Sequence, residues 1–84
     1  MTKVVVYTKD GCHLCENVIA VLEKLAAEHP LEVSSQDITA DARLFERFKD
    51  IIPVVEVDGK VRVGGSTLSN QSTLEGVLRK ALFP

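Results

Sequence analysis

The amino-acid sequence predicts an α/β domain whose elements follow the order β-α-β-α-β-β-α. Three observations support this class. A short β-branched and aromatic run at residues 4–8 precedes a long apolar repeat at spacings of three and four, which indicates a buried strand and then an amphipathic helix. Two β-rich runs flank Asp58-Gly59, the strongest hairpin signal in the chain. A second clean helical repeat follows near the C-terminus.

Length and composition predict one globular domain over residues 1–84. The chain has 84 residues, of which 45% are hydrophobic and 26% charged, an ordinary globular composition. A net charge of −2 without a Lys/Arg cluster argues against a nucleic-acid partner. We recognise neither a signal peptide nor an apolar segment long enough to cross a membrane, so we expect a cytoplasmic monomer with no membrane partner.

The first half of the chain predicts a β-α-β unit. The helix covers about residues 14–28 and is stopped by His29-Pro30, because proline cannot donate a helical hydrogen bond. A second strand runs from Leu31 to Asp37-Ile38, and a right-handed crossover makes it the parallel neighbour of the first strand. The inward face of the helix consists of Cys15, Val18, Ile19, Leu22, Leu25 and Ala26.

The middle of the chain predicts a second helix and a hairpin. Thr39 or Asp41 can cap the helix, which ends near Asp50. Pro53 then opens strands at residues 54–57 and 60–63, and either a two-residue turn or a bulged three-residue loop fits between them. Gly64-Gly65 ends the hairpin. The inward stripe of the helix is Leu44, Phe45 and Phe48.

The last helix can be capped by Ser69, Asn70 or Ser72, and Ser72 has capping-box spacing to Glu75. Gly76 within this helix costs about 1 kcal/mol relative to alanine. We attribute its presence to close packing. The apolar stripe that should dock on the sheet is Leu74, Val77, Leu78, Ala81 and Leu82.

Cys12 and Cys15 are the residues to which we assign chemistry, because they lie at the predicted strand-to-helix turn. Residues three apart in a helical turn have Cβ atoms about 5–6 Å apart, and a disulfide tolerates Cα separations of about 4.4–6.8 Å. The pair can therefore close and reopen with little backbone movement. Cys12 points at unpaired N–H groups of the first turn, which should lower its pKa. Cys15 lies on the apolar face and should act second.

Charged residues near the cysteines affect the Cys12 thiolate, and two other functions of the cysteine pair remain as alternatives. Lys9 supports a Cys12 thiolate and Asp10 and Glu16 oppose it, while we interpret His13 mainly as an exposed residue of the first turn. Thiolates at this spacing also bind zinc or iron–sulfur clusters. One chain offers only the two cysteines, His13 and His29, so a four-ligand site would need glutathione or a second subunit. We expect no bound metal or cofactor. A redox-inert partner-binding module is the third hypothesis.

Three motifs in order give a resemblance that spans essentially the whole chain. They are Tyr7-Thr8-Lys9-x-x-Cys12-x-x-Cys15, then Ile52-Pro53, then Gly64-Gly65-Ser66-Thr67. With these motifs the chain resembles glutaredoxins and, more broadly, the thioredoxin-fold oxidoreductases. The resemblance implies the thioredoxin fold, with a four-stranded mixed sheet flanked by helices on both faces.

The resemblance also implies roles for individual residues. Cys12 corresponds to the nucleophile that attacks a disulfide and Cys15 to the thiol that resolves the mixed disulfide. Pro53 corresponds to the family's cis-proline, and the backbone of Ile52 before it would bind the thiol peptide. The carboxylates and amine of glutathione would be held by Lys9, Gly65, Ser66 and Thr67.

The implied function is reduction of protein disulfides or glutathionylated substrates. Glutathione, or a flavoprotein disulfide reductase, would then reduce the Cys12–Cys15 disulfide again. The chain departs from the usual glutaredoxin pattern at three positions and by the extra residues Ser69 through Ser72 before the last helix. His13 stands where proline is usual, Leu14 where an aromatic residue is usual, and Leu68 where an acidic residue is common.

Overall fold

The computed structural model describes residues 2–68 and 74–83, and its elements follow the predicted order. The predicted caps Ser69, Asn70 and Ser72 lie outside the described residues. Within the described part of the chain, no helix is both long and apolar enough to cross a membrane. The elements are β1 (Thr2–Thr8), α1 (His13–Glu28), β2 (Leu31–Asp37), the 3-10 helix η1 (Ile38–Ala40), α2 (Ala42–Phe48), β3 (Val54–Val57), β4 (Lys60–Gly64), the 3-10 helix η2 (Gly65–Leu68) and α3 (Leu74–Leu82).

The four strands form one mixed sheet in the order β2-β1-β3-β4. β1 pairs in parallel with β2, so that Thr8 lies opposite Asp37. On its other side β1 pairs antiparallel with β3, where Tyr7 lies opposite Val54. The carboxyl end of β1 therefore emerges between the carboxyl end of β2 and the amino end of β3. The loop that follows, and the cysteines with it, begins at this point.

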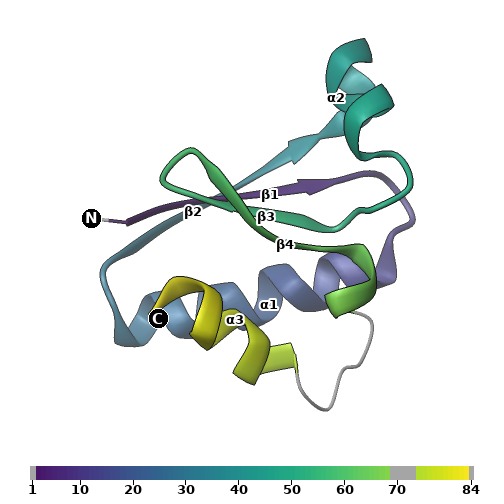
Figure 1. Ribbon diagram of the computed structural model, residues 1–84. Coiled ribbons are helices and arrows are strands. Elements are labelled where there is room, and N and C mark those ends of the chain that lie inside the picture. The colour runs from purple at the N-terminus through teal and green to yellow at the C-terminus, as the bar shows by residue number, and fades with distance from the viewer. Residues whose placement is uncertain (1, 69–73, 84) are drawn as a thin grey trace.

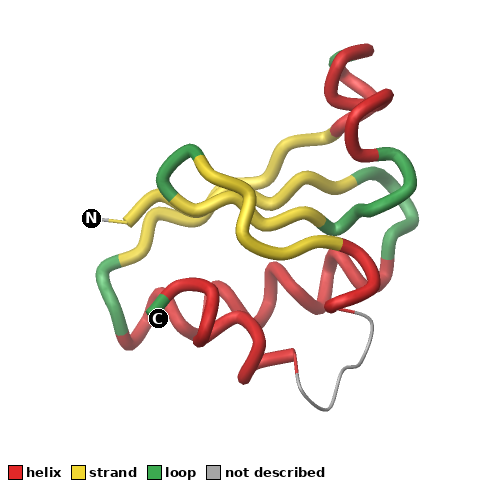
Figure 2. Tube along the Cα trace, viewed as in Figure 1, coloured by secondary structure: helices red, strands yellow, loops and turns green. Residues whose placement is uncertain are grey.

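Helices cover both faces of the sheet, as predicted. α1 and α3 lie side by side beneath one face, and α2 lies across the other face near one end of the strands (Figures 1 and 2). Inward residues alternate along the strands, as expected for a pleated sheet with two covered faces. The core between the sheet, α1 and α3 includes Val4, Val6, Val18, Leu22, Leu25, Val55, Val57, Leu68, Leu74, Leu78 and Leu82.

α2 is shorter than predicted, and one residue of its predicted stripe is not buried. The Asp41 carboxylate accepts the backbone N–H of Arg43 at 2.8 Å and caps the helix, which ends at Phe48 rather than near Asp50. Phe48 is buried, whereas Phe45 is 37% exposed. The prediction for Phe45 was wrong because two turns of helix present only a narrow inward stripe to the sheet.

The hairpin between β3 and β4 contains the two-residue turn, which settles the alternative that the sequence left open. Asp58 and Gly59 have positive φ angles of 48° and 86°, and Val57 lies opposite Lys60. This is the backbone of the tight turn that Asp-Gly favours. The register shifts between Val55 and Glu56, which adds a bulge to β4.

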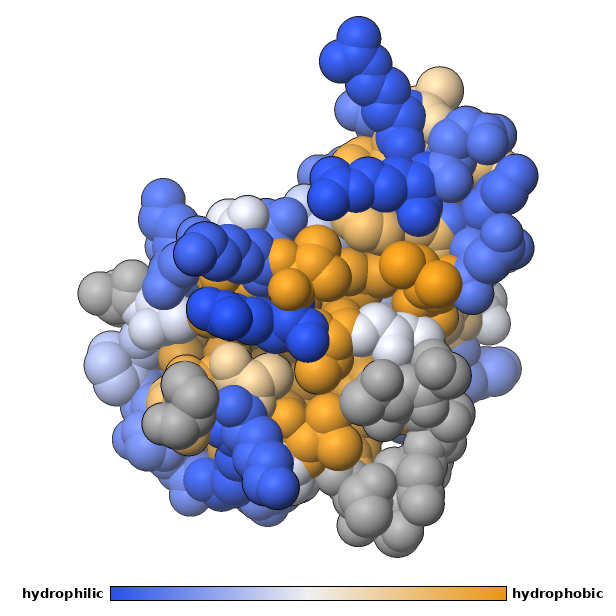
Figure 3. All heavy atoms as spheres, in the orientation of Figure 1, coloured by the Kyte–Doolittle hydropathy of each residue, from blue (hydrophilic) through white to orange (hydrophobic). Residues whose placement is uncertain are grey.

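β4 forms an edge of the sheet, and apolar side chains gather over it on the face shown in Figure 3. Val61 on β4 and Ile51 in the loop before β3 are each 43% exposed. The charged residues Lys60 and Arg62 stand on either side of Val61 in the sequence. Charges placed in this way discourage an edge strand from pairing with another chain.

α3 is fastened to α1 by both apolar and ionic contacts. The Glu75 carboxylate accepts from Lys24 at 2.8 Å and from Arg79 at 3.0 Å, and Arg79 also donates to Glu28 at 3.0 Å. The prediction of close packing at Gly76 is wrong. A Cβ atom there would meet nothing within 4 Å, because Gly76 lies on the exposed side of the helix.

Candidate redox site

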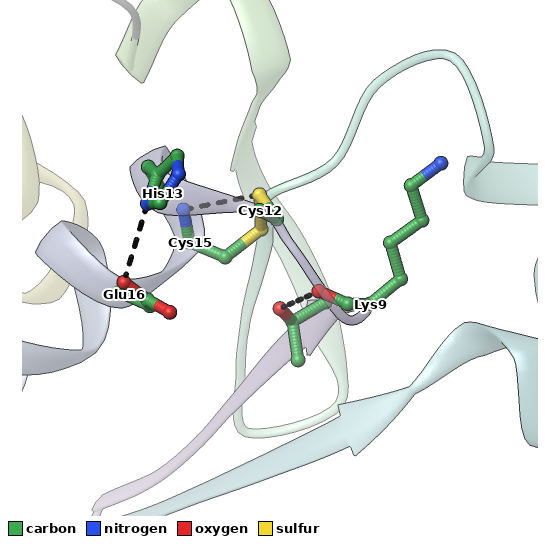
Figure 4. The surroundings of a disulfide bond; sticks show 6 residues. Lys9, Cys12, His13, Cys15 and Glu16 are labelled. Carbon is green, nitrogen blue, oxygen red and sulfur yellow. Dashed lines mark hydrogen bonds and ion pairs between the residues drawn. A yellow bond between two sulfur atoms is a disulfide. The ribbon is translucent and has the colours of Figure 1, made fainter.

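Cys12 and Cys15 form a disulfide at the N-terminus of α1 (Figure 4). Cys12 is the N-cap residue, with extended φ and ψ angles of −88° and 97°, and Cys15 lies in the first turn. Their Cα atoms are 5.2 Å apart, within the range that a disulfide accepts. The geometry expected from the spacing of the two cysteines is confirmed.

A tight turn connects β1 to α1 and places Cys12 at the N-cap of the helix. The N–H of Cys12 donates to the carbonyl of Lys9 at 3.3 Å, and Gly11 has a φ angle of 80°. Glycine reaches this left-handed region without a steric penalty, and it is the usual third residue of such turns. The sequence reasoning assigned no role to Gly11. The Asp10-Gly11 pair before the first cysteine was the available signal.

A backbone N–H at the N-terminus of α1 points at the Cys12 sulfur, where it would stabilise a thiolate in the reduced protein. The N–H of Cys15 donates to Cys12 Sγ at 3.1 Å, which satisfies one of the unpaired groups of the first turn. Cys12 is half-buried, whereas Cys15 is 0% exposed. An incoming sulfur atom can therefore reach Cys12, while Cys15 is shielded behind it. The order of action of the two thiols stays a prediction, which this difference in exposure supports.

His13 and Lys9 direct their side chains away from the disulfide. The His13 and Glu16 side chains are 92% and 72% exposed, and His13 Nδ1 lies 3.6 Å from Glu16 Oε2. Figure 4 shows His13 turned toward Glu16 and the Lys9 side chain extended away from the sulfur atoms. The interpretation of His13 as an exposed residue of the first turn is confirmed.

The amino end of β3 forms one flank of the site. The Ile52–Pro53 peptide bond is cis, as the resemblance implies. Pro53 is buried and directly precedes Val54, which lies opposite Tyr7 at the end of β1. This register places Pro53 beside the strand end from which the Cys12 loop emerges.

Gly65 is bound to the same segment. Its N–H donates to the carbonyls of Ile51 at 2.6 Å and Pro53 at 3.0 Å, and its φ angle is +25°. A Cβ atom on Gly65 would lie 2.9 Å from the Ile51 oxygen. Gly65 therefore fastens the Ile51–Pro53 segment. The backbone of Ser66 and Thr67 continues into η2, and their side chains lie outside the described part of the structure.

The opposite flank is an open hollow of about 370 Å³, which we call the β2-side hollow. It lies at the carboxyl ends of the parallel strands β1 and β2, the position where open α/β sheets bind ligands. Lys9 and Cys12 belong to it, whereas Ile52, Pro53 and Gly65 do not. Its lining residues are Thr8, Lys9, Asp10, Gly11, Cys12, Glu16, Ser35 and Asp37.

Hydrogen bonds within the protein perturb the ionisation of Asp37, one of the residues that line this hollow. Its Oδ1 atom accepts hydrogen bonds from the hydroxyl of Thr39 at 2.6 Å and from the backbone N–H of Thr39 at 2.8 Å. These bonds hold the pKa of the Asp37 carboxyl below its usual value. The sequence reasoning missed Asp37 and Ser35, because only the parallel register of β1 and β2 brings them to the cysteines.

Tyr7 belongs to the packing beneath α2. Its hydroxyl donates to Glu56 at 3.1 Å, and its ring stacks on Phe48 with the ring centroids 4.7 Å apart. Partial burial, and then the Glu56 carboxylate, raise the pKa of Tyr7.

Over residues 2–68 and 74–83, no group of three or more His, Cys, Asp or Glu side chains is arranged to hold a metal ion.

Solved structures with similar folds include three that cover most of the chain. Protein Ne2328 from Nitrosomonas europaea has a TM-score of 0.71 and 29% identity, over 92% of this chain and 89% of that one. A malarial protein has a TM-score of 0.63 and 14% identity, over 98% of both chains. A mutant thioredoxin from Halobacterium salinarum has a TM-score of 0.61 and 19% identity, over 99% of this chain and 78% of that one. The last two show the fold alone.

A family model assigns the chain more closely. The model described as glutaredoxin-like domain (DUF836) matches residues 3–82, which is nearly the whole chain. No curated protein matches the sequence. The sheet order, the helices on both faces and the Cys12–Cys15 pair agree with this assignment. The chain therefore belongs to the glutaredoxin-like domain family and adopts the thioredoxin fold.

Proposed function

We propose that this protein is a thiol–disulfide oxidoreductase that reduces protein disulfides or glutathionylated substrates through a Cys12–Cys15 dithiol/disulfide cycle. The observation that carries the proposal is the asymmetric pair itself. A half-exposed Cys12 sulfur lies at a helix N-terminus and is bonded to a fully buried Cys15. Membership of the glutaredoxin-like family supports the same redox role.

The substrate is reduced in two exchange steps. The Cys12 thiolate attacks one sulfur of the substrate disulfide, so that a Cys12–substrate bond forms and the substrate S–S bond breaks. The released sulfur leaves as a thiolate and takes a proton from water. Cys15 then gives up its proton and attacks Cys12 Sγ, which forms the Cys12–Cys15 bond and releases the second substrate thiol. Two electrons pass from the protein to the substrate.

The protein must then be reduced again by an external donor. Two glutathione thiols can attack in succession and leave as glutathione disulfide, or a flavoprotein disulfide reductase can deliver the two electrons. Neither route requires a prosthetic group on this chain. We place the cycle in the cytoplasm, where such donors keep thiols reduced.

The backbone beside the cysteines supports binding of an extended substrate. Ile52 is half-buried next to the cis peptide bond, at the sheet position adjacent to the Cys12 loop. We propose that its backbone pairs with the substrate segment that carries the reacting cysteine. Lys9, and the backbone of Gly65, Ser66 and Thr67, remain candidates for glutathione contacts, although the Gly65 N–H is already bound within the protein.

The experiment that tests this proposal is NADPH consumption with hydroxyethyl disulfide, a small neutral substrate. One arm supplies glutathione with glutathione reductase, a second supplies thioredoxin reductase alone, and the Cys12→Ser variant is the control in both. We expect turnover in at least one arm and none above background with the variant. Silence in both arms, or equal rates for wild type and Cys12→Ser, would overturn the proposal in favour of a redox-inert partner-binding module.

A further inference from the structure

The β2-side hollow has no role in the exchange steps described above, yet Cys12 forms part of its wall. A substrate sulfur that approaches Cys12 must bring its neighbouring residues close to this hollow, because consecutive Cα atoms are only about 3.8 Å apart. A volume of about 370 Å³ falls within the range of small-ligand pockets, about 300–1,000 Å³. The hollow is therefore large enough to receive a long side chain of the substrate.

The charges that line the hollow come from three separate elements. Asp10 lies in the loop after β1, Glu16 in the first turn of α1 and Asp37 at the end of β2. The lining residues include these three carboxylates and one cationic side chain, that of Lys9, so their formal charges sum to −2. The hydrogen bonds from Thr39 fix the position of the Asp37 carboxylate and lower the pKa of Asp37.

The flank of Cys12 on the β3 side is apolar rather than charged. The segment Ile51–Pro53 presents apolar side chains and backbone, and the Gly65 N–H is bound to its carbonyls. The substrate therefore meets the side-chain carboxylates on the β2 side of the disulfide and backbone on the β3 side. A cation beside the reacting cysteine is attracted at that point, whereas a carboxylate there is repelled.

We propose that the β2-side hollow selects disulfide substrates that carry lysine or arginine next to the reacting cysteine. This inference rests on the proposed function and adds to it a class of substrate. The cation would lie in the hollow, near the carboxylates that line it, while the substrate sulfur lies in line with the Cys12–Cys15 pair. The preference is electrostatic, so it should weaken as the salt concentration rises.

The test compares two peptide disulfides in a single turnover. The probes are the disulfide dimers of acetyl-Gly-Cys-Lys-amide and acetyl-Gly-Cys-Glu-amide, each mixed with pre-reduced wild-type protein at low salt. We expect the lysine peptide to react about tenfold faster, because the carboxylates of the hollow attract lysine and repel glutamate. The ratio of the two rates should fall toward one in about 0.5 M salt.

Variants test whether the hollow causes the preference for the lysine peptide. Asp10→Asn should lower the ratio about threefold and Asp10→Lys about tenfold. Glu23→Gln removes the same charge from an exposed position of α1 outside the hollow, and it should leave the ratio unchanged. Circular dichroism checks that each variant is folded.

The outcomes separate this inference from the proposed function. Equal rates for the two peptides, or a ratio that Asp10→Lys does not change, would overturn the substrate preference. If wild-type protein still reduced hydroxyethyl disulfide in that case, the exchange activity would stand without it. Failure with hydroxyethyl disulfide and with both peptides would instead overturn the proposed function, and the preference with it.

Discussion

The two flanks of Cys12 are built from different parts of the chain. On the β3 side, the flank consists of backbone: a cis peptide bond before Pro53 and the Gly65 N–H bound to the carbonyls of Ile51 and Pro53. On the β2 side, the flank consists of side chains, with carboxylates from Asp10, Glu16 and Asp37 around an open hollow.

The difference indicates a division of labour. Backbone groups can pair with any extended substrate, and we propose that the β3 flank supplies binding that is independent of substrate sequence. Charged side chains can discriminate between substrates, and we propose that the β2 flank supplies such a preference. Cys12 lies between the two and serves both. Each flank can be altered separately, because neither shares a residue with the other apart from the cysteine loop.

The largest expected effect comes from the cysteines, on which both flanks act. Cys12→Ser should abolish disulfide reduction, because serine does not form the mixed disulfide. Cys15→Ser should retain the first attack and accumulate a mixed disulfide, because the resolving thiol is missing. Intact-mass spectrometry after incubation with a disulfide-bearing protein measures the adduct. An adduct on Cys12→Ser, or none on Cys15→Ser, would contradict the assigned order.

A smaller effect should follow when the β3 flank is distorted. Gly65→Ala places a Cβ atom 2.9 Å from the Ile51 oxygen at a φ angle of +25°, and we expect it to reduce the free energy of unfolding by about 1–3 kcal/mol. Urea denaturation measures this loss.

Gly76→Ala is the matched control for that substitution. A Cβ atom at Gly76 meets nothing within 4 Å, and alanine is favoured in a helix by about 1 kcal/mol, so this variant should be more stable than wild type. Equal effects of the two substitutions would show that the contact of Gly65 with Ile51 is unimportant.

The smallest expected effect comes from the ionic contacts between α1 and α3, which lie outside both flanks. The hydrogen bond from Lys24, and then that from Arg79, lower the pKa of Glu75. Because the pKa is lower in the folded state, the stabilisation is present above the ordinary glutamate pKa of about 4.3 and is lost as the pH falls below it. Glu75→Gln should therefore be slightly less stable than wild type at pH 7 and equal to it in strong acid.

Urea midpoints for both proteins at the two pH values measure this difference. A difference that persisted unchanged in strong acid would show that lost packing, rather than lost charge, explains the effect of Glu75→Gln. The exchange activity at pH 7 should be the same in both proteins, because Glu75 lies outside the redox site.

The sequence predicted the arrangement of strands and helices because the apolar spacing differs between the two kinds of element. It also predicted the geometry of Cys12 and Cys15, since a helical turn fixes the distance between residues three apart. It overestimated the burial of Phe45 and the packing at Gly76. Both errors concern which side of a helix meets the sheet, which depends on helix length and docking angle.

The parts of the site that the sequence missed depend on long-range register. Asp37 reaches the cysteine loop only because β1 and β2 pair in parallel with Thr8 opposite Asp37. The tie between Gly65 and Ile51 depends on how the end of β4 packs against the loop before β3. Neither relation has a local signature, so neither could be predicted from the spacing of residues.

The central claim is that Cys12 is the accessible nucleophile and Cys15 the shielded partner of a reversible disulfide. Brief alkylation of the reduced protein with substoichiometric iodoacetamide, followed by peptide mass spectrometry, tests it most directly. We predict that the label appears on Cys12 and that reoxidation before alkylation removes it from both cysteines. Labelling of Cys15 first, or equal labelling of both, would contradict the account.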